Sequence, residues 1–241
     1  MAVVVAKIYI LRHAETAFNR QELVQGQLDT PLHEAGELQA ELAANALKDV
    51  PFGVGGAAYT SDLERARKTA EIILKDHPGV KLETVEALRE RFSADWQGGS
   101  VHGRGTTPPD AESHADVVAR SVKWWNETIT EHVQRKAAEL ETIEAIEPTQ
   151  DGAESEEGRH AFDPAHILVV SHGGVIGRMV PELIKSSKVR RLEGVENPEE
   201  RRCATASISI IETYEDGKGV LVSYADTTHL SKDLVQEGAD D

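Results

Sequence analysis

The chain has 241 residues, of which 39% are hydrophobic and 28% are charged, and its formal net charge at pH 7 is −16. This composition is typical of a soluble globular protein, and no apolar run approaches the ~20 residues that cross a membrane. The negative charge disfavours nucleic acid or an anionic membrane surface as the partner. Cys203 is the single cysteine, so no intrachain disulfide can form and we expect a reducing, cytoplasmic location.

Strands and helices are predicted to alternate along the chain. Six short apolar runs rich in β-branched residues predict strands at 3–11, 57–60, 81–85, 167–171, 207–214 and 220–225. Apolar residues at helical spacing predict helices at 35–50, 63–75, 114–140 and 174–186. This order favours an α/β fold, a three-layer sandwich with a mostly parallel central sheet and helices on both faces. A short polar turn around Gly217 joins the last two strands, which predicts an antiparallel edge.

The sequence contains no internal repeat and no second hydrophobic core, so we expect residues 1–241 to form one domain. One stretch within it is strongly acidic, because eight Asp and Glu residues and no Lys or Arg lie between Ala137 and Gly158. We predict a mobile, solvated insertion at about 138–165, with an acidic docking segment as the alternative. A second acidic stretch, 235–241, is expected to be a frayed tail.

Polar side chains gather where four of the predicted strands end. In an open α/β sheet, ligands bind at the carboxyl ends of the strands, so we expect these side chains to meet in one crevice. They are Arg12 and His13 after the first strand, Asp62 and Arg65 after the second, Arg89, Glu90 and Arg91 after the third, and His172, Gly173 and Gly174 after the fourth.

These residue types suit phosphoryl transfer. A neutral imidazole can take a phosphoryl group as a covalent intermediate, and arginine presents planar, permanently charged donors to phosphate oxygens. A second histidine can donate to the charge of the transition state, and a carboxylic acid can protonate the leaving alkoxide. Each motif alone is better explained by an ordinary turn, cap or surface charge pair. Only their joint occurrence favours a phosphate site.

The combined motifs resemble the histidine phosphatase superfamily, in the branch that includes phosphoglycerate mutases and broad-specificity phosphatases. RHAET with the asparagine that follows (12–19) is similar to the RHGExxxN signature, with alanine in place of the usual glycine. SDLERARKTAE (61–71) is close to SDLxRAxxTA, and LRERFSADWQGG (88–99) resembles LxExxFGxWEG. SHGG (171–174) supplies the second histidine. The resemblance covers essentially the whole chain except the acidic insertion.

The resemblance implies a role for each matched residue. His13 is implied to be the nucleophile, which forms a phosphohistidine, and Glu90 is implied to be the proton donor. Arg12, Arg65 and His172 are implied to hold the phosphoryl group.

The resemblance also implies a set of substrate contacts. These fall at Asn19, Gln25, Gly26 and Gly173. The chain departs from the family pattern after the proton donor, where Ser93 and Ala94 replace an aromatic-glycine pair and Gln97 replaces a glutamate. We expect these changes to affect substrate preference and not the reaction.

We expect a phosphomonoester hydrolase that acts on small phosphorylated metabolites, with a phosphopeptide as an alternative substrate. A mutase is the first alternative function, but it needs extra cations in a closing segment, and the Gly- and Pro-rich segment 92–112 offers only His102 and Arg104 for this. The second alternative is a catalytically silent phosphate-binding or scaffolding protein. The remaining histidines have no metal-ligand spacing, so we expect no metal and no cofactor.

Overall fold

The computed structural model describes residues 2–53, 55–146 and 162–235. In these ranges, seven strands form one sheet in the order β3-β2-β4-β1-β6-β7-β5. Strand β6 is antiparallel to both of its neighbours, and the other pairs are parallel. The strands are β1 Val4–Arg12, β2 Ala57–Thr60, β3 Leu82–Thr84, β4 Ala165–Ser171, β5 Val189–Arg191, β6 Ile208–Tyr214 and β7 Gly219–Asp226.

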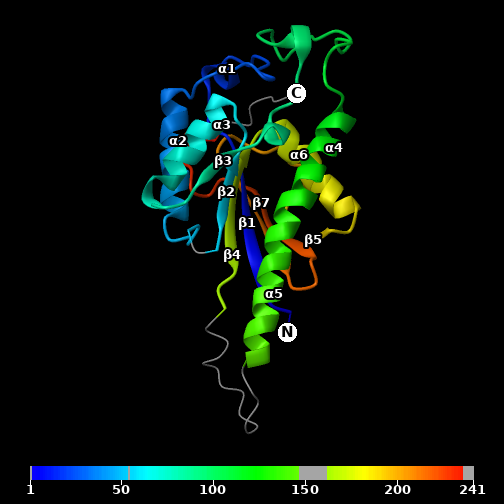
Figure 1. The fold of residues 1–241 in the computed structure, drawn as a ribbon. Helices are drawn as coiled ribbons and strands as arrows, with labels where there is room; N and C mark the ends of the chain where they lie inside the picture. Colours follow the sequence, from blue (N-terminus) through cyan, green and yellow to red (C-terminus); the bar gives the residue numbers. More distant parts are fainter. Residues whose placement is uncertain (1, 54, 147–161, 236–241) are drawn as a thin grey trace.

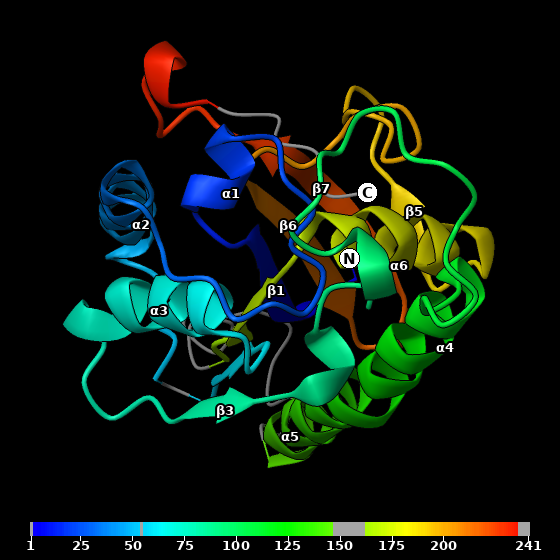
Figure 2. The same ribbon diagram turned by 90° about the horizontal axis from the view of Figure 1, so that it is seen from above.

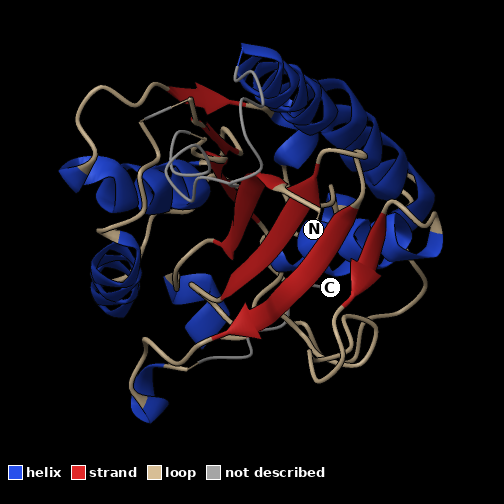
Figure 3. Cartoon of the chain, turned by 90° about the horizontal axis from the view of Figure 1, so that it is seen from below, coloured by secondary structure: helices blue, strands red, loops and turns tan. Residues whose placement is uncertain are grey.

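Helices cover both faces of this sheet (Figures 1 and 3), so the predicted α/β fold class is confirmed. Helices α2 and α3 pack on one face, and α4, α5 and α6 pack on the other. The helices are α1 Ala17–Arg20, α2 Glu34–Leu47, α3 Glu64–Ile73, α4 His114–Trp124, α5 Thr130–Ile146 and α6 Gly173–Lys185. No helix in the described ranges has the length and apolar character needed to span a membrane.

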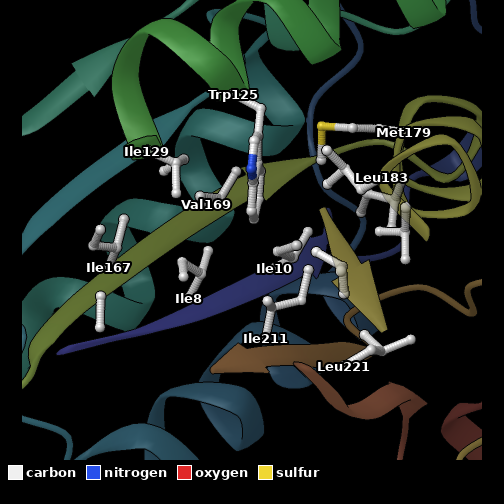
Figure 4. Close-up of a cluster of buried hydrophobic side chains, with 14 of the residues drawn as sticks. Ile8, Ile10, Trp125, Ile129, Ile167, Val169, Met179, Leu183, Ile211 and Leu221 are labelled. Atoms are coloured by element: carbon white, nitrogen blue, oxygen red, sulfur yellow. The ribbon is translucent and has the colours of Figure 1, made fainter. Parts of the chain in front are cut away.

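Strand β1 is apolar except for Lys7 and its last residue, Arg12, because both of its faces are covered. Ile8 and Ile10 belong to the cluster under α4, α5 and α6, which Figure 4 shows in close-up. Tyr9 and Leu11 belong to the cluster under α2 and α3. Each large aliphatic side chain buried in this way stabilises the fold by about 1.5–3 kcal/mol. The two clusters hold β1 rigidly, and with it the residues at its carboxyl end.

Two elements were not predicted. Strand β5 has only three residues, two of them exposed arginines, so it carries no apolar run; it extends the sheet beyond β7. Helix α1 is a single turn held by a reciprocal cap between Thr16 and Asn19. Because β5 extends the sheet beyond β7, the antiparallel strand β6 lies inside the sheet and β5, which is parallel to β7, forms its edge.

The helix predicted over 114–140 is longer and is interrupted. A π-helical turn at Trp125–Ile129 separates α4 from α5. Both Trp124 and Trp125 are buried, and the wider turn lets two adjacent large side chains pack on the core. Helix α5 continues to Ile146, so the first third of the predicted acidic insertion (138–165) is helical.

The structure describes the rest of the two predicted acidic segments, 138–165 and 235–241, only in part. Residues 147–161 of the predicted insertion lie outside the described residues, and β4 already begins at Ala165. Of the predicted tail at 235–241, residues 236–241 also lie outside the described residues.

Candidate active site

Two histidines lie side by side at the carboxyl edge of the sheet, which is the edge seen from above in Figure 2. Strands β1 and β4 are parallel neighbours in which Arg12 pairs with Ser171. The residues that follow them are therefore also neighbours, and the His13 N–H donates to the Ser171 carbonyl at 2.9 Å. The ring centroids of His13 and His172 are 5.0 Å apart.

The hydrogen bonds of His13 define its tautomer. Its Nδ1 lies 2.8 Å from the Ala14 carbonyl, which can only accept, so Nδ1 carries the proton. The Arg65 Nε–H donates to His13 Nε2 at 3.3 Å, which requires a lone pair there. Burial, and then the charges of Arg65 and Arg12, hold the pKa of His13 well below its usual value. His13 is therefore a neutral imidazole with its nucleophilic lone pair on Nε2.

Arg65 is fully buried in the first turn of α3. Besides its bond to His13, its Nη1 donates to the Leu28 carbonyl and its Nη2 donates to the Gly26 carbonyl, each at 2.8 Å. These bonds fix the guanidinium plane beside His13. They also attach the 26–28 loop to the site.

Arg12 ends β1 with 1% of its surface exposed. Its Nη1 donates to the Cys203 carbonyl at 2.7 Å. The segment before β6 contacts the site a second time, because the Ala206 N–H donates to the His13 carbonyl at 3.2 Å. The last residues before β6 therefore support both Arg12 and His13.

His172 occupies the N-cap position of α6 and is fully buried. Neither of its ring nitrogens has a hydrogen-bond partner among the described residues. Burial, and then the charge of Arg65, hold its pKa well below the usual value. A buried donor left unsatisfied costs about 1–3 kcal/mol, so the site is built for a ligand that accepts hydrogen bonds.

The Glu90 carboxylate lies at the same helix N-terminus. Its Oε2 accepts from the Gly174 N–H at 3.0 Å, and its Oε1 accepts from the Arg91 N–H at 2.7 Å. A Cβ on Gly174 would lie 2.3 Å from Glu90 Oε1. Glycine at 174 is therefore a steric requirement for this carboxylate position.

The guanidinium groups of the two arginines that flank Glu90 each bind a partner elsewhere in the chain. The Arg89 guanidinium forms an ion pair with Asp62, with Nε donating to Oδ1 at 2.7 Å. The Arg91 Nη1 donates to the Glu112 carbonyl at 3.2 Å.

The predicted substrate contacts lie on α1, on the loop after it and at the start of α6. The Asn19 Oδ1 accepts from the Thr16 N–H at 3.0 Å, and the Gln25 Oε1 accepts from the Thr16 hydroxyl at 2.9 Å. The amide nitrogens of both side chains are buried and have no partner in the described ranges. Gly26 contributes its carbonyl to Arg65, and Gly173 is the first residue of α6.

Two residues near the site were not singled out from the sequence. Arg120 on α4 donates through Nη1 to the Ala87 carbonyl at 2.7 Å and through Nη2 to the Glu90 carbonyl at 3.3 Å. Helical spacing alone gives no signal for this role. Thr205 has a buried hydroxyl with no partner in the described part of the chain, and its neighbours contact Arg12 and His13. Its place in ATASI (204–208), which is similar to the NTSI element of the family that the sequence resembles, was the available signal.

The segment 92–112, called the lid below, bonds to the loop after α1 through the Gly98 N–H and the Val24 carbonyl at 2.8 Å. Leu23 and Ser100 form a β-bridge between the lid and the loop after α1. His102 pairs with Glu22 at the surface, and Arg104 lies with its guanidinium carbon 4.7 Å from the centre of the Trp96 ring.

The inward-facing groups at the two histidines are mainly N–H and O–H donors and guanidinium cations, which bind anion oxygens. Within the described residues, no group of three or more His, Cys, Asp or Glu side chains is arranged to hold a metal ion. The donor set therefore suits a phosphoryl group. Residues 8–227 match the histidine phosphatase superfamily (branch 1). The chain belongs to this superfamily.

Individual relatives are similar over most of their length. A metal-independent phosphoserine phosphatase of Arabidopsis thaliana is 27% identical over 241 residues, covering 98% of this chain and 88% of the relative. A fructose-2,6-bisphosphatase, TIGAR B of Danio rerio, is 31% identical over 194 residues, covering 73% of this chain and 74% of the relative. The solved structure of a mycobacterial hydrolase aligns with a TM-score of 0.66 and 25% identity, covering 96% of this chain and 95% of that one. Phosphatases thus recur among the relatives of this histidine phosphatase superfamily member.

Proposed function

We propose that this protein hydrolyses phosphomonoesters of small metabolites through a phosphohistidine on His13. The observation that carries the proposal is the state of His13, a buried neutral imidazole whose Nε2 lone pair faces the guanidinium of Arg65. A cation beside a neutral nucleophile attracts the phosphate dianion without protonating the attacking atom.

In the first step, His13 Nε2 attacks phosphorus and the bond to the leaving oxygen breaks. Arg12, Arg65 and His172 donate to the equatorial oxygens, where the transition-state charge is spread. Glu90, as a carboxylic acid, gives its proton to the departing alkoxide. The products are a phosphohistidine, a free alcohol and the Glu90 carboxylate.

In the second step, a water molecule attacks the phosphohistidine in line with the His13 Nε2–phosphorus bond. The Glu90 carboxylate takes the proton of the water, the nitrogen–phosphorus bond breaks, and inorganic phosphate leaves. This returns His13 to its neutral form and Glu90 to its acid form, so one water is consumed for each phosphate released.

Hydrolysis is favoured over phosphoryl transfer to a second metabolite by the contacts of the lid cations. The His102 side chain is 72% exposed and pairs with Glu22. The Arg104 Nε donates to the Val101 carbonyl within the lid itself. Both contacts engage the lid cations with groups of the protein itself.

Phosphate release from p-nitrophenyl phosphate and from a panel of sugar phosphates, phosphoglycerates, phosphoserine and phosphotyrosine peptides tests the proposal. We expect turnover that persists in EDTA and is abolished by His13→Ala, with small metabolites preferred over peptides. No turnover of any of these by the wild-type protein, combined with tight phosphate binding, would instead support the scaffolding alternative.

A further inference from the structure

Helix α3 contacts the loop after β1 through a buried hydroxyl, that of Thr69. This residue is fully buried and lies four positions after Arg65, on the same side of the helix. Its hydroxyl donates to the Arg65 carbonyl at 2.7 Å, and its oxygen accepts from the Ala14 N–H at 3.0 Å. A hydroxyl has one proton, and a carbonyl can only accept, so the direction of both bonds is fixed. Thr69 therefore joins the backbone of Arg65 to the backbone of Ala14.

Ala14 in turn holds the ring of His13. Its carbonyl accepts from His13 Nδ1 at 2.8 Å. The other ring nitrogen, Nε2, accepts from the Arg65 Nε–H at 3.3 Å. Both nitrogens of the imidazole are thus connected to α3, Nε2 directly through Arg65 and Nδ1 through Ala14 and Thr69.

The backbone on either side of Ala14 binds elements other than α3. The His13 N–H donates to the Ser171 carbonyl at 2.9 Å, and the Glu15 N–H donates to Gln39 Oε1 at 2.8 Å. These bonds would remain if the hydroxyl were removed, so the loop would stay attached to β4 and α2. The buried Ala14 N–H, in contrast, would lose its acceptor. Loss of the hydroxyl should therefore loosen the position of Ala14 without unfolding the loop.

We propose that Thr69 is a positioning residue for the nucleophile, and that its hydroxyl sets where His13 Nε2 lies relative to Arg65. This role rests on the proposed function, because the position of Nε2 matters only if it attacks phosphorus. A reacting group misplaced by about 1 Å slows a reaction about 10²-fold. The Arg65 guanidinium itself is fixed by the Gly26 and Leu28 carbonyls, so it stays in place without the hydroxyl. Thr69 therefore affects the rate of attack and not the affinity for the anion.

Exchange of the His13 Nδ1 proton with solvent, measured by NMR on the free protein, tests the positioning role without reference to any reaction. Thr69→Ala should speed this exchange about fivefold, the factor that corresponds to one neutral hydrogen bond. Thr69→Ser keeps the hydroxyl and should exchange at nearly the wild-type rate. Thr213→Ala is the matched control, because it removes a buried hydroxyl that donates to the Ala6 carbonyl at the other end of β1, and it should change nothing. Unchanged exchange in Thr69→Ala, or equal exchange in Thr69→Ala and Thr69→Ser, would overturn the role of the hydroxyl.

The effect on the reaction is measured by single-turnover phosphorylation together with binding of tungstate, a dianion that mimics phosphate. Thr69→Ala should slow phosphoenzyme formation from p-nitrophenyl phosphate at least about tenfold, while tungstate affinity changes by less than about threefold. Thr69→Ser should restore most of the rate, and Thr213→Ala should leave both quantities unchanged. An unchanged rate in Thr69→Ala, or equal losses of rate and affinity, would overturn the proposal. If the wild-type protein formed no phosphoenzyme, the proposed function would fail, while the exchange of the ring proton would still decide whether Thr69 positions His13.

Discussion

The Arg65 Nε–H donates to His13 Nε2 at 3.3 Å, so a permanent cation contacts the atom implied to be the nucleophile. This contact gives two advantages at once. It lowers the pKa of the imidazole and keeps the lone pair available, and it places a phosphate-binding group within reach of any phosphorus that approaches Nε2.

Anion binding should be accompanied by proton uptake at His172. In the free protein the pKa of His172 is held well below its usual value, mainly by burial, so the ring is neutral at about pH 7.5. A bound dianion stabilises the protonated ring and raises that pKa. Calorimetry of tungstate binding in buffers of different ionisation enthalpy should show uptake of a proton in the wild type and none in His172→Gln. Zero uptake by the wild type would show that His172 binds as a neutral donor.

The same two histidines should make the fold sensitive to acid. The pKa values of His13 and His172 are lowered by burial in the folded protein and are about 6.5 in an unfolded chain. Below about pH 6.5 the unfolded state takes up protons that the folded state refuses, so stability is present in full above that pH and is lost as the pH falls. The urea midpoint should therefore be lower at about pH 5.5 than at about pH 7.5.

Burial also lowers the pKa values of three half-buried histidines, so they add to the loss of stability in acid. They are His132, His166 and His229. Replacing His172 by Gln should reduce the difference between the two midpoints. An unchanged difference between the midpoints would show that His172 does not contribute to the acid sensitivity.

The position of Glu90 should depend on Gly174 in the first turn of α6. Gly174→Ala places a methyl group 2.3 Å from Glu90 Oε1, and the carboxylate must move. We expect turnover to fall at least about tenfold. Gly177→Ala is the matched control on the same helix, because nothing lies within 4 Å of its Cβ, and it should stabilise the helix by about 0.5–1 kcal/mol with turnover unchanged. Equal turnover in the two variants would show that the position of the Glu90 carboxylate does not affect the reaction.

The role of Glu90 as a proton donor can be tested by comparing substrates that have different leaving groups. A sugar alkoxide needs a proton in order to leave, whereas p-nitrophenolate leaves readily without one. Glu90→Gln should slow phosphoenzyme formation from an alkyl phosphate roughly 10²–10⁴-fold, and from p-nitrophenyl phosphate much less. Single-turnover phosphorylation with both substrates measures this. Equal losses would indicate that Glu90 positions the site and that another group is the acid.

Much of the fold could be predicted because its central strands are apolar runs. Strand β1 alternates between two buried faces, so nearly every residue is apolar and the run ends at Arg12. Strand β5 was missed because three residues with two exposed arginines carry no such pattern. The π-helical turn was missed because the wider turn depends on how Trp124 and Trp125 meet the core, which the helical spacing does not encode.

The site was predictable where residues follow strands directly. His13 and His172 are adjacent because β1 and β4 are parallel neighbours, and alternating strands and helices favour such pairing. Contacts that depend on loop conformation were not predictable. Examples are the bond from Arg89 to Asp62, the bond from Arg91 to the Glu112 carbonyl, and the bond from the Gln27 N–H to Gln97 Oε1. All three depend on turns whose shape the sequence pattern leaves open.

The most direct test of the central claim is the identity of the phosphorylated atom. Protein quenched during turnover of ³²P-labelled substrate should carry an acid-labile, alkali-stable label that maps to His13 and is absent from His13→Ala. Because Nδ1 is committed to the Ala14 carbonyl, the hydrolysate should contain the Nε2 isomer of phosphohistidine. Label that persisted in His13→Ala, or the Nδ1 isomer in the wild type, would contradict the account.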